Sequence, residues 1–174
     1  MFTLRGQMLR LNRSDKGPLR RVFGGSATFA TTAADTAVNY NLVTPSVVQF
    51  SAIKTPANNN DITADLLNNR FIINTPGRYI AIFMLPHFST GERASLEGYM
   101  SVNGVRATAK SYSYIRPNAR AHNRSDVRGR SIIDVSTGDF LTTELVRAEG
   151  STTLEPITLL ENATFGILKV NDWI

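Results

Sequence analysis

The sequence offers few residues that could carry out acid–base or metal chemistry. It contains two histidines, His87 and His122, and no cysteine. Neither histidine has a ligand-spaced partner, and a thiolate metal site cannot form. Ser89, His87 and Asp139 could be imagined as a catalytic triad, yet there is no G-x-S-x-G turn, and such triples arise by chance. We expect both histidines to be ordinary surface residues and predict neither enzymatic activity nor a cofactor.

An asparagine-rich segment supplies oxygen atoms of the kind that calcium prefers. Asn58, Asn59, Asn60 and Asp61 follow one another, and Asp65 comes four residues after Asp61. The spacing of an EF-hand and its distal glutamate are both absent. The segment is therefore interpreted as a solvated loop, and no metal ion is predicted.

Arginines recur at every fourth position in the second half of the chain. At helical spacing they would place like charges on one face, which is unfavourable, and Pro117 favours a long loop. Two interpretations stay open. The loop is either a basic patch for an acidic protein surface, a glycan or a phosphate, or simply a solvated connection. The arginines of this basic loop are Arg116, Arg120, Arg124 and Arg128 at this spacing, joined by Arg130 two residues further on.

The whole net charge of +5 lies at the N-terminus. Residues 1–25 hold six of the 19 Lys and Arg residues and one of the 14 Asp and Glu residues. The rest of the chain therefore has 13 basic and 13 acidic residues and no net charge. Such asymmetry is typical of an interaction segment. The basic residues are Arg5, Arg10, Arg13, Lys16, Arg20 and Arg21.

Apolar residues such as Phe2, Leu4 and Phe23 separate these charges without a helical or a strand period. Gly17-Pro18 and Gly24-Gly25 interrupt any helix, so the segment is predicted to be an extended arm that becomes ordered on a partner. Its aliphatic side chains favour docking on a protein, and nucleic acid is not expected as a partner, because no recognised nucleic-acid module is present. Residues 26–37 are interpreted as a linker.

Beyond the arm, short β-type runs alternate with turn residues, which is typical of an all-β sandwich of two antiparallel sheets. Two short helical pieces are expected, at Ile62–Leu67 and Arg93–Leu96. The domain division is therefore 1–37 for arm and linker and 38–174 for the sandwich. The expected strands are Val38–Val43, Val47–Ile53, Phe71–Asn74, Tyr79–Leu85, Gly98–Val102, Val105–Tyr114, Ser131–Val135, Phe140–Arg147 and Ala163–Val170.

Asn103-Gly104 is the sharpest local signal, because both residues tolerate the positive φ angles of a type I′ hairpin turn. The strand Tyr79–Leu85 is apolar on both faces, which indicates that both faces are covered. A loop or another subunit could provide the second cover. Candidate residues for this core or subunit interface are Tyr79, Ile80, Ile82, Phe83, Met84, Phe140 and Phe165.

Length and composition fit one domain: the chain has 174 residues, of which 42% are hydrophobic. The first residues carry charges every few positions and lack the apolar run of a signal peptide. No segment approaches the roughly 20 apolar residues of a membrane span, so no membrane is expected.

Four segments together resemble the jelly roll of tumour necrosis factor (TNF) and the complement globular head. Residues 48–52 resemble its first strand, and residues 69–83 its Phe strand, Pro-Gly turn and Tyr strand. Residues 138–145 resemble its Gly-Asp turn and strand, and residues 163–168 its closing Phe-Gly strand. The resemblance implies a TNF-like fold and a compact homotrimer. With a basic arm and no cysteine, the chain also resembles the decoration or cement proteins of bacteriophage heads.

These observations predict a structural virion protein, namely a homotrimer that docks on the major capsid protein through its arm and stabilises the shell. We expect it on the capsid surface after assembly in the host cytoplasm. The alternative is a receptor- or glycan-binding fibre tip whose loops carry the function, so a glycan remains a possible partner.

Overall fold

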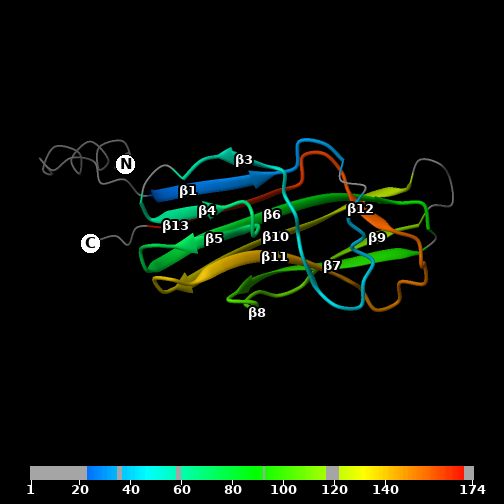
Figure 1. Cartoon of the computed structure of the whole chain (residues 1–174). Helices are drawn as coiled ribbons and strands as arrows, with labels where there is room; N and C mark the ends of the chain where they lie inside the picture. Colours follow the sequence, from blue (N-terminus) through cyan, green and yellow to red (C-terminus); the bar gives the residue numbers. More distant parts are fainter. Residues whose placement is uncertain (1–22, 35–36, 58–59, 92, 117–121, 171–174) are drawn as a thin grey trace, which may run out of the picture.

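The computed structural model describes residues 23–34, 37–57, 60–91, 93–116 and 122–170, and these residues form strands and no helix (Figure 1). The all-β prediction is confirmed. The strands are β1 (Phe23–Ala30), β2 (Ser46–Val47), β3 (Ala52–Thr55), β4 (Ile62–Asp65), β5 (Arg70–Ile73), β6 (Gly77–Ser89), β7 (Ala94–Val102), β8 (Val105–Arg106), β9 (Ser111–Ile115), β10 (Arg124–Val135), β11 (Phe140–Arg147), β12 (Ile157–Leu159) and β13 (Thr164–Val170).

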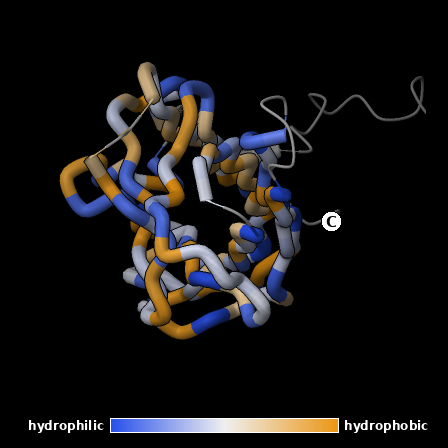
Figure 2. The backbone as a smooth tube through the Cα atoms, turned by 90° about the vertical axis from the view of Figure 1, so that its right-hand side faces the viewer, coloured by the Kyte–Doolittle hydropathy of each residue, from blue (hydrophilic) through white to orange (hydrophobic). Residues whose placement is uncertain are grey.

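The strands form two antiparallel sheets that pack face to face. Sheet A has the order β10-β6-β13-β1-β3, with β12 paired to β6. Sheet B has the order β4-β5-β11-β7-β8, with β2 paired to β11 and β9 paired to β7. Figure 2 shows hydrophobic and hydrophilic positions following each other along the chain, as expected when each strand has one buried face. The predicted two-sheet jelly-roll sandwich is confirmed.

Aromatic rings from both sheets meet in the core. Phe29 of β1 and Phe71 of β5 stack with their ring centroids 4.2 Å apart. Phe165 of β13 lies 5.0 Å from Phe71, and Phe50 lies 5.7 Å from Phe29. Because β1 and β13 belong to sheet A and β5 belongs to sheet B, these rings join the two layers within the core.

Two glycines make room for a large core ring. A Cβ atom on Gly129 of β10 would overlap the ring of Phe83, and a Cβ on Gly98 of β7 would lie 2.7 Å from Val127 Cγ1 and 3.3 Å from Phe83 Cε2. Phe83 of β6 is only 2% exposed. The two glycines therefore let β10 and β7 approach a phenylalanine that larger side chains would displace.

The predicted hairpin is confirmed: β7 pairs with β8 around Asn103-Gly104, whose φ angles are 52° and 76°. The second strand of the hairpin is divided, because residues 107–110 separate β8 from β9. Gly77, after Pro76, has a φ of 140°, a conformation that side-chain-bearing residues rarely adopt.

Four secondary-structure predictions are wrong. The strand expected at Val47–Ile53 is interrupted, because residues 48–51 form no strand and its two ends belong to β2 in sheet B and β3 in sheet A. Ile62–Asp65 and Ala94–Leu96 lie in β4 and β7 rather than in helices, and Arg93 has a φ of 53°, outside the helical region. Residues 38–43 form no strand in the structure. There Tyr40 N–H donates to Ile157 O, and Leu42 O accepts from Arg147 N–H. These are isolated hydrogen bonds to two different segments, so they do not make a strand.

The linker predicted for residues 26–37 is wrong in its first part. Residues 23–30 form β1, which lies between β13 and β3 in sheet A. Ala27 and Phe29 are fully buried, so this segment belongs to the core despite its small residues. Phe23, predicted as part of the arm, pairs with Val170 at the start of β1. The remaining arm residues lie outside the described part of the chain: Phe2, Leu4, Arg5, Arg10, Arg13, Lys16, Arg20 and Arg21.

Candidate functional site

Strand β6 carries the two-sided apolar run that the sequence indicated, and the structure separates its two faces. Tyr79 and Phe83 point into the core, where they are 0% and 2% exposed. Ile80, Ile82 and Met84 alternate with them and point outward from sheet A, and Ile82 is 48% exposed. The predicted set of core or interface residues therefore divides between the core and a partly uncovered outer surface.

Neighbouring strands extend the uncovered surface. Ile132 of β10 and Leu168 of β13 lie on either side of Ile80 in register. Ile132 is 61% exposed, while Ile80, Met84 and Leu168 are half-buried. Ile80, Ile82 and Leu168 line a shallow groove of about 390 Å³ between β1, β6 and β13, where Gly166 lies opposite Ile82. We call the outward side chains the apolar face of sheet A: Ile80, Ile82, Met84, Ile132 and Leu168.

Arginines border this face, and their predicted place in a loop is wrong for three of them. Arg124, Arg128 and Arg130 lie on β10, exposed and on its outer side. A spacing of four residues is also two strand repeats, so the pattern fits a strand whose intervening Val127 faces the core. Arg130 lies opposite Ile82, and Arg128 Nη2 bonds to Asp126 Oδ2 at 2.6 Å. Arg116 follows β9 and is exposed, and Arg120 lies outside the described residues.

The two remaining interface candidates do not belong to this surface. Phe165 is fully buried among the core rings. Phe140 starts β11 in sheet B, where the guanidinium of Arg70 lies 5.1 Å from its ring centroid. The structure thus brings Ile80, Ile82 and Met84 together on one surface and places Phe140 on the opposite sheet.

Sequence reasoning missed Ile132 and Leu168. Both belong to strands that were predicted, but the neighbouring strands in sheet A are far apart in the sequence, so their outward residues could not be matched with those of β6. The signal was the apolar pair Ile132-Ile133, in which one residue must face outward when the other is buried.

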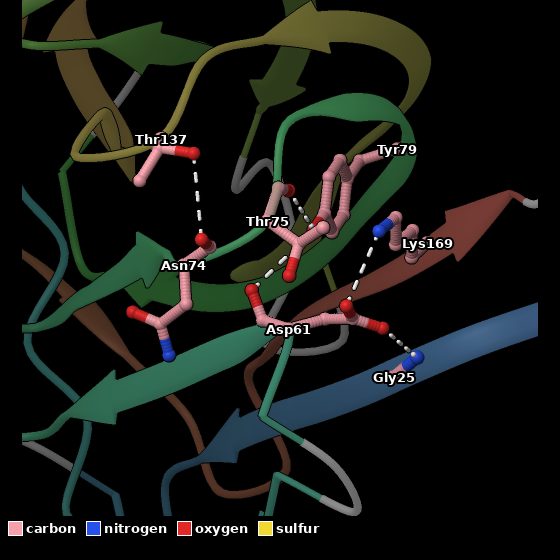
Figure 3. A network of polar contacts seen from close by, with 7 residues as sticks. All are labelled: Gly25, Asp61, Asn74, Thr75, Tyr79, Thr137 and Lys169. Carbon is pink, nitrogen blue, oxygen red and sulfur yellow. Dashed lines mark hydrogen bonds and ion pairs between the residues drawn. The ribbon is translucent and has the colours of Figure 1, made fainter.

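A polar network fixes the start of β1, where the N-terminal segment joins the sandwich (Figure 3). The Asp61 carboxylate accepts a hydrogen bond from Gly25 N–H at 3.1 Å and pairs with Lys169 Nζ at 3.2 Å. Its main-chain oxygen accepts from Asn74 N–H at 2.8 Å. The Tyr79 hydroxyl donates to Thr75 O at 2.8 Å. Asp61 therefore connects β1, β13 and the turn that precedes β6.

The pKa of Tyr79 and the low exposure of the Asp61–Lys169 pair show that this network is largely shielded from water. Burial, with the Asp61 charge as a second cause, raises the pKa of Tyr79 to about 12. The side chains of Lys169 and Asp61 are 14% and 19% exposed, so their ion pair is largely withdrawn from water. Such a pair resists separation more than an exposed one, because breaking it leaves a partly buried charge without its partner.

The two carboxylates that were considered as calcium ligands each have partners within the protein. Asp61 is engaged by Lys169 and Gly25, whereas Asp65 bonds to Arg70 at 2.8 Å and to Asn68. Hydrogen bonds from Asn68 and then Arg70 lower the pKa of Asp65. Asn58 and Asn59 lie outside the described residues. Among the residues that the structure describes, no group of three or more His, Asp and Glu side chains could hold a metal ion.

His87 is buried, so the prediction of a surface histidine is wrong for it; His122 is exposed. The long strand β6 carries His87 inward, where its ring lies 3.0 Å from Leu85 O through Nδ1 and 2.9 Å from Ser113 Oγ through Nε2. Burial lowers the pKa of His87, and the Leu85 carbonyl and the Asp126 charge partly oppose that shift.

The imagined triad is not assembled. Both ring nitrogens of His87 are engaged by Leu85 and Ser113. Ser89 Oγ accepts from Gly91 N–H, and the Asp139 carboxylate accepts from Ser136 N–H and from Asn103. These bonds, Ser136 first, lower the pKa of Asp139. Asp139 therefore stabilises a turn and does not orient the histidine.

Comparison with known proteins identifies the fold. The solved TNF of Eiger type from S. frugiperda has a TM-score of 0.57 at 10% identity, covering 88% of this chain and 96% of that one. Murine APRIL has a TM-score of 0.58 at 9% identity, covering 84% and 98%. The globular domain of zebrafish complement 1qA has a TM-score of 0.56 at 16% identity, covering 86% and 98%. The fold is the TNF and complement 1q jelly roll.

The predicted resemblance in fold is thus confirmed, and at these identities it extends to the fold alone. No family model and no curated protein matches the sequence. Within the described ranges, the structure has no helix with the length and hydropathy needed to cross a membrane.

Proposed function

We propose that this chain is a non-catalytic structural protein that forms a homotrimer and decorates the outside of a viral capsid. The observation that carries the proposal is the apolar face of sheet A. Ile82 and Ile132 are 48% and 61% exposed there, beside the half-buried Ile80, Met84 and Leu168. Contiguous apolar patches of this kind on a folded domain usually mark a contact with another protein.

A second copy of the chain is the occupant that best fits this face. The jelly roll that the chain shares with TNF and complement heads supports a compact trimer, in which every copy contributes the same surfaces. A closed ring satisfies all its contacts at once and cannot grow into a fibre. Exposed arginines at the edge of the face, Arg128 and Arg130, would remain at a solvated rim, as charges do at protein interfaces.

Attachment to the shell is assigned to residues 1–22. This segment holds six basic residues among aliphatic ones, whereas the remaining chain has no net charge. It enters the sandwich at β1, where Asp61 connects Gly25 to Lys169. A load on the arm would therefore reach β13 and β4 as well as β1. Three arms on one trimer would bind repeated shell sites with high avidity.

His87, Ser89 and Asp139 each form hydrogen bonds with other groups and not with one another, which supports a role without catalysis. The chain would act mechanically, by linking neighbouring shell subunits.

Electron microscopy with gold-labelled antibody against the protein tests this function on virus particles that contain it. Regularly spaced label over the head is the expected result, and removal of residues 1–22 should abolish it while the sandwich stays folded. Label confined to tails or fibre tips would overturn capsid decoration and favour a receptor-binding role.

A further inference from the structure

Strand β9 exposes two tyrosine side chains on the outer side of sheet B. Tyr112 is 65% exposed and Tyr114 is 52% exposed, while Ser113 and Ile115 between and after them are buried. Alternate residues of a strand point to the same face about 7 Å apart. The two rings thus stand side by side on a surface that lies on the opposite sheet from the apolar face described above.

A depression adjoins the tyrosines. It has a volume of about 550 Å³ and is lined by β7, by the end of β11 and by the turn after β11. Tyr112 lies directly opposite Glu97 of β7 in register, and Glu97 belongs to the lining. Cross-strand partners have their side chains on the same face, so Tyr112 stands at the margin of the depression.

The lining combines hydrogen-bonding groups with a little apolar surface. Glu97, 6% exposed, is paired with Lys110. Arg147 Nη2 donates to Ser151 O at 2.9 Å, which holds the guanidinium against the turn. Glu149 is exposed, and Val43 is 81% exposed at the rim. Donors and acceptors of both signs therefore line a space beside two aromatic rings.

We propose that Tyr112, Tyr114 and this depression form a saccharide-binding site. The apolar C–H faces of sugar rings stack on the tyrosines, and their hydroxyl groups bond to Arg147, Lys110 and Glu149. The volume lies within the roughly 300–1,000 Å³ of small-ligand sites, which suits a short oligosaccharide. The charged lining is unlike the apolar cores of protein contacts, which favours a polyhydroxylated ligand over a protein. The site does not depend on capsid attachment.

Chemical-shift titration of the full-length, ¹⁵N-labelled protein tests the site with four trisaccharides: maltotriose, cellotriose, chitotriose and trigalacturonic acid. At least one should shift the amide signals of residues 95–97, 111–115 and 147–151. Binding of the three neutral sugars would show recognition of hydroxyl groups. Tighter binding of trigalacturonic acid would show that Arg147 and Arg116 also recognise carboxylates. The double variant Tyr112→Ala/Tyr114→Ala should weaken binding about tenfold or more, because ring contacts supply much of such affinity.

Tyr112→Phe/Tyr114→Phe keeps the stacking faces and should bind within about threefold of the original protein, while Leu67→Ala, at an exposed residue outside the depression, is the matched control. The proposal is overturned if none of the four sugars shifts these signals, or if the alanine pair binds as well as the phenylalanine pair. A fall in the native mass of the alanine pair would also overturn it, because the tyrosines would then belong to a contact between copies.

Discussion

Ile132 and Ile80 lie directly opposite each other on β10 and β6, and both side chains point away from the core of the sandwich. Leu168 of β13 continues the same row on the other side of Ile80. Three apolar side chains on three adjacent strands of a sheet thus face outward together. Their arrangement is the basis of the proposed self-association, and it can be changed without touching the core.

Replacing Ile82 by Asp should separate the trimer while leaving the sandwich folded. The side chain points outward, so its charge is solvated in the single copy but would be buried without a partner in the trimer, which costs several kcal/mol. Sedimentation should show a loss of trimer, with an unchanged circular dichroism spectrum. Leu67→Asp, at a side chain that is 90% exposed, is the control and should stay trimeric. An Ile82→Asp protein that remains trimeric would exclude this face as the contact.

Gly129→Ala should lower the free energy of unfolding by about 2–3 kcal/mol, because the added methyl group overlaps the Phe83 ring. Urea denaturation measures the loss. Phe83→Leu in the same chain should recover part of it, since the smaller side chain makes room, so the two changes should be strongly non-additive. Simple additivity would mean that Gly129 and Phe83 are not in contact.

Asp61→Ala should destabilise the protein by about 1–3 kcal/mol, because Lys169 loses its carboxylate in a partly buried place and Gly25 N–H loses its acceptor. Hydrogen exchange should become faster at residues 25–28. Asp134→Ala is the comparison: its pair with Arg78 has side chains 74% and 52% exposed, and its removal should cost no more than about 0.5 kcal/mol. Equal effects of the two variants would contradict the role given to Asp61.

His87 should make stability depend on pH. Its pKa in the folded protein lies below the ordinary value of 6.5, mainly because of burial, so the unfolded chain takes up the proton first on acidification. The stability is therefore fully present above about pH 6.5 and falls as the pH drops below it, by at most about 1.4 kcal/mol per unit. His87→Gln should remove this component of the slope, whereas His122→Gln, at an exposed residue, should keep it. A slope unchanged in His87→Gln would refute the assignment.

The sequence predicted most of those elements that local chemistry determines. Asn103-Gly104 specified its hairpin because only a few residues tolerate positive φ at both central positions. The apolar run of β6 was also recognised, because residues 79–85 are apolar at both odd and even positions and so on both faces of a strand. The TNF-like fold was confirmed by the solved structures, whereas residues 48–51, which resemble its first strand in sequence, form no strand.

Other features depend on partners far apart in the chain and could not be predicted. The strand β1 is rich in small residues and resembles a linker, yet pairing with β13 and the burial of Phe29 make it a central strand. The arginines of β10 suggested a loop because their spacing was compared with a helix rather than with two strand repeats. His87 was assigned to the surface because nothing local shows that Ser113 of β9 lies beside it.

The native mass of the full-length protein tests the proposed self-association most directly. One chain has a mass of 19.1 kDa, so a trimer should appear at about three times that value in native mass spectrometry at micromolar concentration. We expect the trimer to dominate and to persist after removal of residues 1–22, because the apolar face lies entirely within the sandwich. A single species at 19.1 kDa would contradict the account.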